Sequence, residues 1–359
     1  MILVTGGLGF IGSHTARALH DLGAPALPAS RHPRSSDVIP AAIEVAAVDC
    51  TDPQSLSALG RRHRITAIVH LAAAPLGGRT PLGGRTALGG RTALGGRTAL
   101  GGGTPAALSG GTALSGGTAL DDLEQNTASV FAIMRAAAEW NVHRVVVAST
   151  IGIYAGVGEV PWREDAPLPL ASPHPIPASK KVAEIVAMAS GLDVVVARIG
   201  GIWGPQGRPA SPFIAAPALI HRAAAQIRAG TINKAAGEPA SSAGSTATSG
   251  GDVYAEDGAD ILYARDCGAA LALLATADGL RHRLYNVGSG RATTNAEVVA
   301  AITAVHPEVA LPLADGASGP GPAPWLDTAR LAAEGWAPSW PLDRAVPDYL
   351  DWLAAGRAR

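Results

Sequence analysis

Residues 2–12 read ILVTGGLGFIG, and this stretch decides the fold class of the chain. The apolar run at 2–5 predicts a buried strand, and a helix is predicted after it from 13 to 22. Gly6, Gly9 and Gly12 lie between the two. Gly6 allows a tight turn, Gly9 lets the backbone approach a pyrophosphate, and Gly12 lets the helix pack closely on the strand. The stretch therefore predicts a strand–turn–helix unit that binds a dinucleotide.

This glycine-rich turn is predicted to hold the dinucleotide phosphates on the free N–H groups at the start of the helix. A turn with no ligand is the alternative, and the position of the motif between a strand and a helix disfavours it. The residues predicted to contact the cofactor here are Gly6, Gly9, Phe10, Ile11 and Gly12.

The end of the second predicted strand, 23–29, bears on the choice between NAD and NADP. An acidic residue there would bind the ribose 2′-hydroxyl of NAD, but the next residues are Ser30 and Arg31. Ser30 can donate to a 2′-phosphate and Arg31 can pair with it, so we favour NADP over NAD. The alternative is that Arg31 and Arg34 are simply solvated loop residues. Asp49 and Cys50, after the third strand, are expected to contact the adenine.

The rest of the first half alternates short β-branched runs with helical stretches, the pattern of a parallel sheet covered on both faces. Residues 65–71 and 145–148 are predicted strands. Two helices are predicted to bury one face each, formed by Val130, Ile133, Met134 and Ala137 in one and by Val182, Ile185, Val186 and Ala189 in the other. We therefore predict an α/β fold, a Rossmann-type doubly wound parallel sheet with a small C-terminal substrate lobe.

The chain is predicted to divide into an NAD(P)-binding Rossmann domain at 1–200 and a mixed substrate-binding lobe at 201–359. Some segments of the lobe are expected to return to the Rossmann sheet. Residues 76–120 form an insertion built on the hexapeptide LGGRTA. We expect a flexible surface insertion, because glycine is entropically costly to order, and a short left-handed β-helix is the alternative.

The net charge and the cysteine content bear on the cellular compartment of the protein and on the classes of partner it binds. The formal net charge of −1 gives no reason to expect nucleic acid or a membrane as a partner. Cys50 and Cys267 are the two cysteines, too few for a disulfide framework, which favours a reducing compartment. No secretory leader or long apolar run is recognised, so we expect a cytoplasmic protein with a small-molecule substrate and no metal site.

Several further motifs occur in an order that is typical of one enzyme family. They are HLAA at 70–73, Asn126, STIGIY at 149–154, SKKVAE at 179–184, RIGGIWGP at 198–205, YARD at 263–266, YNVGSG at 285–290 and EGWAP at 334–338. Together with the glycine-rich turn, they resemble the extended short-chain dehydrogenases/reductases, the NAD(P)-dependent sugar epimerase/dehydratase family. The resemblance implies further cofactor contacts at Leu71, Ala72 and Ala73.

The resemblance also implies a catalytic set, and one member of it is missing. In the family, a Ser or Thr holds the reacting oxygen, a Tyr is the acid/base, and a Lys four residues later binds the nicotinamide ribose. Thr150 matches the hydroxyl and Lys180 matches the lysine, but Ile176 occupies the tyrosine position. If Lys181 were the family lysine, Pro177 would take that position instead. Neither register supplies a tyrosine.

Three side chains are candidates to replace the missing acid/base, which is worth ~10²–10⁴-fold in rate. Tyr154 follows the STIGI segment, and packing beside the site is its alternative role. His174 lies between prolines and titrates near neutrality, although an exposed loop histidine is the plainer interpretation. Glu164 precedes the proline-rich loop together with Asp165, and a solvated turn without a catalytic role is the plainer interpretation of the pair.

We therefore predict an NAD(P)-dependent epimerase/dehydratase/reductase-like enzyme with a non-standard acid/base. Its substrate is expected to be a nucleotide sugar or a secondary-metabolite hydroxy or keto compound. Two alternatives stay open: a non-redox cyclase, lyase or isomerase on the same scaffold, and a non-catalytic NADP-binding sensor. The sequence also leaves the oligomeric state open, with a homodimer as one candidate.

Overall fold

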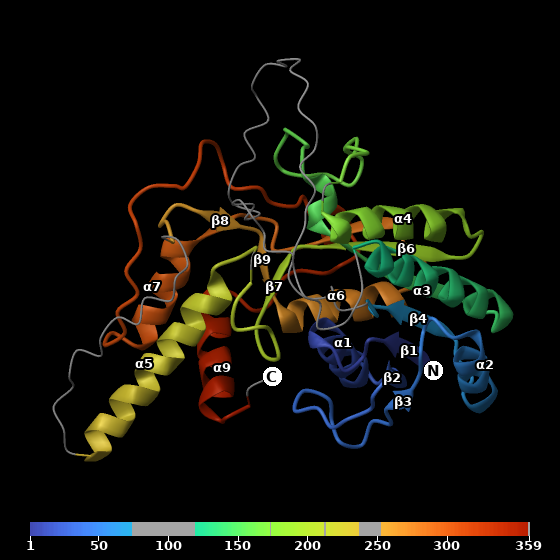
Figure 1. Ribbon diagram of the computed structural model, residues 1–359, viewed down its shortest axis with the longest axis horizontal. Helices are drawn as coiled ribbons and strands as arrows, with labels where there is room; N and C mark the ends of the chain where they lie inside the picture. The colour runs from blue at the N-terminus through green and yellow to red at the C-terminus, as the bar shows by residue number, and fades with distance from the viewer. Residues whose placement is uncertain (74–118, 173, 212, 237–252, 358–359) are drawn as a thin grey trace.

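The computed structural model describes residues 1–73, 119–172, 174–211, 213–236 and 253–357 (Figure 1). Its main sheet has seven strands in the order β10-β6-β5-β4-β1-β2-β3, and every neighbouring pair is parallel. The strands are β1 (Ile2–Thr5), β2 (Ala26–Ser30), β3 (Ala46–Ala47), β4 (Ala67–His70), β5 (Arg144–Thr150), β6 (Val194–Ile199) and β10 (Leu284–Val287). The predicted α/β class with a doubly wound parallel sheet is confirmed.

Helices cover both faces of this sheet, because successive side chains of each buried strand point to opposite faces. Leu3 and Val145 face a core shared with α2 (Pro53–Arg62), α3 (Ala119–Glu139) and α4 (Pro175–Ala189). Their neighbours Val4 and Val146 face a second core, shared with α1 (Phe10–Asp21) and α6 (Ala264–Thr276). The strands are apolar on both faces, and the sequence runs that predicted them are correspondingly unbroken.

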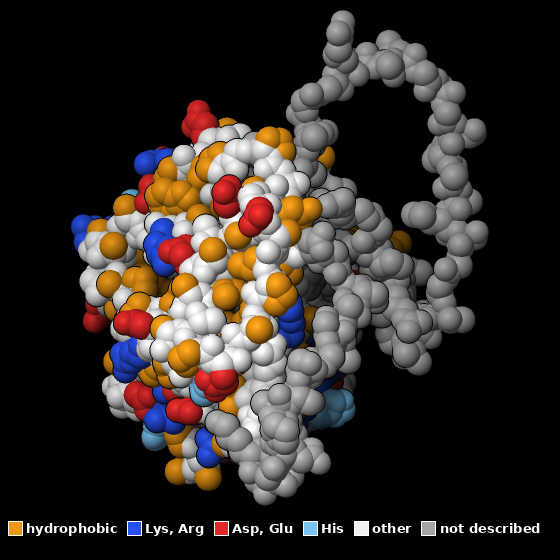
Figure 2. Space-filling model, turned by 90° about the vertical axis from the view of Figure 1, so that its left-hand side faces the viewer, with side chains coloured by type: hydrophobic (Ala, Val, Ile, Leu, Met, Phe, Trp, Pro, Cys, Tyr) orange, Lys and Arg blue, Asp and Glu red, His pale blue; other side chains and the backbone are white. Residues whose placement is uncertain are grey.

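A smaller lobe lies beside the sheet, at the left of Figure 1, and has its own core. It contains α5 (Ala216–Ala236), α7 (Asn295–Val305), α9 (Leu342–Ala354) and the strand pairs β7 (Gly201–Trp203) with β9 (Ile261–Tyr263) and β8 (Gly258–Ala259) with β11 (Thr293–Thr294). Three later segments belong to the Rossmann body instead: α6, β10 and the short α8 (Ala329–Ala332), whose Leu331 joins the second core. On the face seen in Figure 2, charged side chains of both signs are mixed with apolar ones.

The strand registers bring four strand ends to one edge of the sheet. Thr5 at the end of β1 pairs with His70 at the end of β4, and Thr150 at the end of β5 pairs with Ile199 at the end of β6. The short helix η1 (Ile151–Tyr154) follows β5 at the same edge. Ligands of open α/β sheets bind at the carboxyl ends of the strands, so this edge is where a site is expected.

Two details of the sequence prediction need correction. The face formed by Val130, Ile133, Met134 and Ala137 is buried as predicted. In α4 the predicted face is wrong, because Ile185 is 66% exposed while Ala183, Glu184 and Ala187 face inward. A buried arginine pairs with Glu184 and turns this polar side of the helix toward the body, which apolar spacing alone cannot reveal.

The second correction concerns the hexapeptide insertion. Most of it lies outside the described residues, so its two interpretations stay predictions. Its last residue, Leu120, belongs to the first turn of α3, so the helix begins before the predicted end of the repeat. Alanine and leucine are both strong helix formers, and the decayed repeat therefore gives no break at this point.

Candidate functional site

The β1–α1 turn has the close packing that a phosphate-binding turn requires. Gly6 has a φ of +67°, a conformation that residues with a Cβ rarely adopt. A Cβ built on Gly6 would lie 2.9 Å from the backbone nitrogen of Ala72, and one on Gly12 would lie 2.2 Å from the carbonyl oxygen of Gly6. The β1–α1 turn, the first turn of α1 and the residues after β4 therefore pack closely together, which brings backbone N–H groups to the start of α1. These residues fit a bound dinucleotide.

A cavity of about 490 Å³ opens beside this turn, and we call it the first cavity. Nine of the predicted cofactor residues line it: Gly6, Gly9, Ser30, Arg31, Asp49, Cys50, Leu71, Ala72 and Ala73. His32, to which the sequence analysis assigned no role, and Arg34, which it weighed as solvated, also line this cavity. It missed Gln125 and Ser129 on α3. No local pattern marks the α3 residues, because they are brought here by the packing of a helix that follows a long insertion.

A second cavity of about 320 Å³ continues from the first, and the two share Gly6, Gly9, Leu71 and Ala73. Its other lining residues include the predicted Phe10, Ile11, Gly12, Thr150 and Lys180, and also Ala148, Ser149, Ile199 and Gly200. The shared residues make the two cavities one groove that runs along the carboxyl edge of the sheet. Such a groove suits an elongated dinucleotide with its two halves on either side of the glycine-rich turn.

Two hydroxyl groups at the end of β5 line the second cavity. Thr150 Oγ1 accepts a hydrogen bond of 3.2 Å from the backbone nitrogen of Gly152, which leaves its own proton to donate elsewhere. Ser149 Oγ is buried and has no hydrogen-bond partner among the described residues. A buried polar atom without a partner is uncommon and indicates a ligand or water at that point. The sequence prediction included Thr150 and missed Ser149, although the two are adjacent.

His70 lies under the groove and is held neutral. Its Nδ1 is 2.8 Å from Thr5 Oγ1, and its Nε2 is 3.5 Å from Ser129 Oγ. Because Thr5 Oγ1 already accepts from the backbone nitrogens of Leu71 and Ala72, its proton goes to His70 Nδ1. Burial lowers the pKa of His70 to about 3, and the charge of Lys180 acts in the same direction. This histidine therefore braces the β1 and β4 ends and carries no charge at neutral pH.

The two lysines of α4 have different positions. Lys180 lines the second cavity, and burial lowers its pKa to about 8 while the charge of Glu184 opposes that change. Lys181 donates instead to the backbone oxygens of Pro169 and Ala171 in the loop before the helix. Of the two family registers considered for the sequence, the one with Lys180 and Ile176 has its lysine at the cavity.

Ile176 and His174 lie at the start of α4. His174 caps the helix, because its Nδ1 accepts a hydrogen bond of 3.3 Å from the backbone nitrogen of Ile176. The ring packs edge-on against Phe213, with 6.2 Å between centroids, and burial lowers its pKa. Since the nitrogen that could take a proton is occupied by the cap, His174 is poorly placed to act as a base. It does not line either cavity.

Tyr154 belongs to a buried polar network below the groove. Its hydroxyl donates to Asn286 Oδ1 at 2.8 Å and accepts from Arg198 Nη1 at 2.9 Å. Arg198 in turn holds both carboxylate oxygens of Glu184, at 2.8 and 3.1 Å. Burial raises the pKa of Tyr154 to about 12, and the ring stacks on Trp162. These contacts are those of a structural tyrosine, and Tyr154 lines neither cavity.

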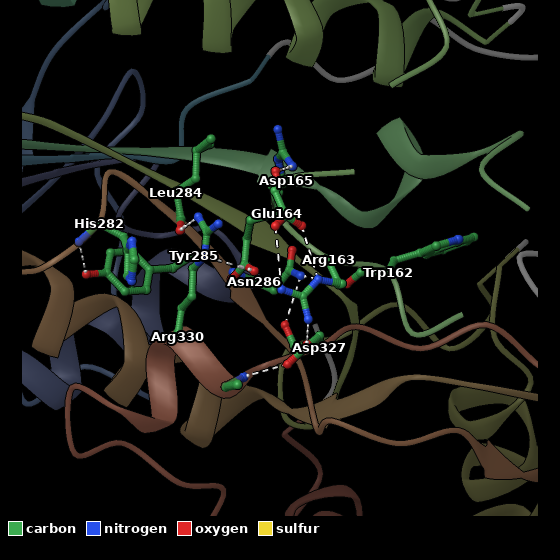
Figure 3. Close-up of polar contacts among 12 residues, drawn as sticks. Trp162, Arg163, Glu164, Asp165, His282, Leu284, Tyr285, Asn286, Asp327 and Arg330 are labelled. Atoms are coloured by element: carbon green, nitrogen blue, oxygen red, sulfur yellow. Dashed lines mark hydrogen bonds and ion pairs between the residues drawn. The ribbon is translucent and has the colours of Figure 1, made fainter. Parts of the chain in front are cut away.

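Glu164 is the third candidate acid/base, and it joins the same network because its backbone oxygen accepts from Arg198. Figure 3 shows its carboxylate beside Asn286 and Arg330. Its carboxylate accepts from the backbone nitrogen of Asn286 at 2.9 Å and pairs with Arg330 at 3.5 Å. Burial raises the pKa of Glu164, but the side chain is oriented toward Asn286 and Arg330 and lines neither cavity. It links the loop after η1 to β10 and α8.

Within the described ranges, no group of His, Cys, Asp and Glu side chains is arranged to hold a metal ion. None of the helices described has the length and apolar character needed to cross a bilayer.

Comparisons with known proteins agree with the fold and the motifs. A UDP-glucose 4-epimerase from Azospirillum brasilense is 29% identical over 371 residues, which cover 98% of this chain and 91% of that protein. The solved UDP-glucose 4-epimerase from Thermotoga maritima with UDP-glucose has a TM-score of 0.68 at 18% identity and covers 99% of both chains. The one from Thermus thermophilus in complex with NAD has a TM-score of 0.63 at 23% identity and covers 98% of this chain and 97% of that one.

The likeness to the two solved structures establishes the fold. The family follows from the sequence, because the profile of the NAD dependent epimerase/dehydratase family matches residues 2–83 and 104–288, well over half of the chain. The predicted resemblance is thereby confirmed, and the chain belongs to the NAD-dependent epimerase/dehydratase family of enzymes.

Proposed function

We propose that this chain is an NAD(P)-dependent enzyme that reversibly oxidises a hydroxyl of a nucleotide sugar, with a non-standard acid/base. The observation that carries the proposal is the groove formed by the two cavities, whose second part combines Ser149, Thr150 and Lys180. Support for the substrate class comes from the relative of similar length, a UDP-glucose 4-epimerase. We assign substrate binding to the lobe around α5, α7 and α9.

The roles of the groove residues follow from their contacts. A bound nicotinamide dinucleotide supplies the hydride acceptor for oxidation of a hydroxyl and the donor for the return step. The glycine-rich turn binds the phosphates, and the second cavity takes the nicotinamide half. Thr150 donates its free proton to the substrate oxygen and so orients it. Ser149, whose hydroxyl has no partner among the described residues, is positioned to bind the ligand in the same cavity.

The test of this function is direct conversion of a nucleotide sugar. Purified protein is mixed with UDP-glucose or UDP-galactose and each dinucleotide, and the sugars are separated by chromatography. We expect interconversion or oxidation that is lost in Thr150→Val, a variant with the same shape and no hydroxyl. If dinucleotide binds and no nucleotide sugar reacts, the non-redox or sensor alternatives replace this proposal.

We further propose that the preferred dinucleotide is NADP. Ser30, Arg31, His32 and Arg34 lie together at the end of β2 and line the first cavity. Among the described residues, neither arginine has an ion pair that would occupy its guanidinium. Asp49 is the acidic residue of the cavity, and its carboxylate accepts two hydrogen bonds from Thr51, at 2.7 and 2.9 Å. Hydrogen bonds from Thr51 and the charge of Arg31 lower the pKa of Asp49, so this end already has one carboxylate, and a 2′-phosphate would add a second anion beside the two arginines.

Cofactor preference is measured by titrating NADP and NAD into the protein and following intrinsic fluorescence or heat. We expect Arg31→Ala to weaken NADP binding by about 10- to 100-fold, since hydrogen bonds to charged groups contribute about 1.5–3 kcal/mol, and to leave NAD binding unchanged. Arg61→Ala is the matched control, because Arg61 is exposed on α2, donates to Ser57 and lines neither cavity. Tighter binding of NAD than of NADP by the unmodified chain would refute the preference.

A further inference from the structure

The second cavity offers few groups that can move a proton. Among the described residues that line it, Lys180 is the one titratable side chain, and the other polar side chains are the hydroxyls of Ser149 and Thr150. The three candidates considered from the sequence have other roles here. Tyr154 and Glu164 are held in the buried network, and His174 caps α4. An enzyme of the proposed type still needs a proton acceptor for the substrate hydroxyl.

We infer that Lys180 Nζ itself exchanges this proton, in place of the tyrosine that Ile176 replaces, an inference that rests on the proposed function. The position of Lys180 supports it. Nζ has no hydrogen bond or ion pair with any described residue, whereas the neighbouring Lys181 is bound to two backbone oxygens. The lysine amine is therefore available at the cavity that also contains the hydroxyl of Thr150.

The charges around Lys180 leave its ammonium form poorly stabilised. Glu184, one turn farther along α4, accepts hydrogen bonds from Nε and Nη2 of Arg198 on β6, which offsets its charge. On β4, His70 is neutral, and beside η1 the Tyr154 hydroxyl contacts Arg198. Of the buried α3 residues, Val130 and Ile133 are apolar and Ser129 has a neutral hydroxyl, and β5 ends in two hydroxyls. No unpaired anion is left to hold the proton on Lys180 among these residues.

In these surroundings the Lys180 amine can act as a base near neutral pH. Burial lowers the pKa of Lys180 to about 8, so a fraction on the order of one tenth of the amine is neutral at pH 7. A neutral lysine amine is an effective general base, and an arginine in the same place is not, because it keeps its proton.

The O–H bond of the substrate breaks, and its proton forms an N–H bond with the lone pair of Lys180 Nζ. The electron pair of that O–H bond forms the second bond of the carbonyl, while the hydride of the same carbon leaves to the oxidised dinucleotide. In the return direction Lys180 gives the proton back to the oxygen as the carbon regains a hydride.

The first experiment separates cofactor binding from proton transfer. Lys180→Arg keeps a cation that can hold a ribose hydroxyl and removes the ability to lose a proton. We expect its dinucleotide affinity to stay within about tenfold of the unmodified chain, while conversion of UDP-glucose falls by ~10²–10⁴-fold. Lys181→Arg is the matched control and should change neither quantity, because its partners are loop carbonyls outside the cavity.

The second experiment measures Lys180 without turnover. The chain contains three lysines, Lys180, Lys181 and Lys234, against 25 arginines, so NMR spectra of ¹³C-labelled lysine side chains are simple to assign with Lys180→Arg. We expect the Lys180 signal to titrate near pH 8 with or without bound dinucleotide. The lysine signals of the Lys181→Arg variant serve as the reference.

The outcomes distinguish this inference from the proposed function. Titration of Lys180 above pH 10, or conversion in Lys180→Arg within about twofold of the unmodified chain, overturns the inference and leaves the enzyme class intact. Titration near pH 8 without any reaction of a nucleotide sugar supports Lys180 as the base of the site and refutes the substrate class.

Discussion

The most informative residue of this chain is Ile176, because it occupies the tyrosine position of the family one turn before Lys180. Replacing it by tyrosine places a phenol beside a lysine whose charge lowers the pKa of that phenol. We expect Ile176→Tyr to raise turnover of UDP-glucose at pH 7 by at least about tenfold, since a positioned acid/base is worth ~10²–10⁴-fold. Steady-state rates from pH 6 to 9 measure the effect.

Ile176→Phe is the matched control for this variant, because it adds the same ring without the hydroxyl. Its rate should stay at the level of the unmodified chain. Equal rates for the tyrosine and phenylalanine variants would mean that the phenol does not reach the substrate. Pro175 and Pro177 flank the position and define the backbone that presents it.

Tyr154 is expected to contribute to stability and not to proton transfer. Tyr154→Phe removes one hydrogen bond to Asn286 and one from Arg198, both buried. We expect a loss of about 1–3 kcal/mol in the free energy of unfolding, measured in urea, with an unchanged pH dependence of turnover. A hundredfold loss of turnover in a variant of normal stability would instead make Tyr154 the proton carrier.

Two buried histidines should make the fold sensitive to acid. Burial lowers the pKa of His14 to about 4 and that of His70 to about 3, from about 6.5 in the unfolded chain. Below pH 6.5 the unfolded chain therefore binds more protons than the folded one. The stability that these residues contribute is complete above pH 6.5 and is lost as pH falls toward 4 and 3, by about 1.4 kcal/mol per pH unit for each.

Urea unfolding at pH 7.5 and 5.5 measures the direction and the size of this change in stability. His14→Gln keeps a donor for the carbonyl of Pro205, which His14 Nε2 contacts at 3.0 Å, and should reduce the loss between the two pH values. His20→Gln, at an exposed position of the same helix, should not. An equal loss in all three proteins would assign the acid sensitivity to other groups.

At the scale of the elements, the close packing of the β1–α1 turn requires that Gly12 has no side chain. Gly12→Ala would place a Cβ 2.2 Å from the carbonyl oxygen of Gly6, so the turn must open. We expect dinucleotide binding to be lost and the free energy of unfolding to fall by about 1–3 kcal/mol. Calorimetry with and without NADP measures both effects.

Gly230→Ala is the control for that variant. Gly230 lies within α5, and nothing is within 4 Å of the Cβ that it would gain. Alanine in a helix interior is more favourable than glycine by roughly 0.5–1 kcal/mol, so this variant should be slightly more stable and bind dinucleotide normally. Normal binding by Gly12→Ala would show that the turn tolerates the extra methyl.

At the scale of the whole molecule, the helices α3 and α4, which pack against each other, each expose a large apolar side chain. Phe131 on α3 is 45% exposed and Ile185 on α4 is 66% exposed. Two copies can cover such a helix pair by a twofold axis, with each chain offering the same surface. We therefore expect a homodimer, and Phe131→Asp with Ile185→Asp should release monomers in sedimentation or light scattering. Leu22→Asp, exposed at the end of α1, is the control. A monomer in the unmodified chain at high concentration would contradict the expectation.

The fold class could be predicted from local sequence because its signals are local. The alternation of apolar runs with helices determines a parallel sheet, and the glycine spacing at Gly6 and Gly12 determines the turn. The predicted strand at 145–148 is real, and it extends to Arg144–Thr150 in the structure. Helix faces were predictable where the buried side is apolar, as in α3, and not in α4, where Glu184 faces inward.

The sequence by itself determined the family, the dinucleotide-binding turn and the absence of tyrosine at position 176. Tertiary structure decided which of the remaining groups can act, because a pKa and an exposed lone pair depend on neighbours that are distant in sequence. Tyr154 is held by Arg198 and Asn286, 44 and 132 residues away. Lys180 lines the cavity without such a partner among the described residues, and its reduced pKa is a result of burial, which no motif records.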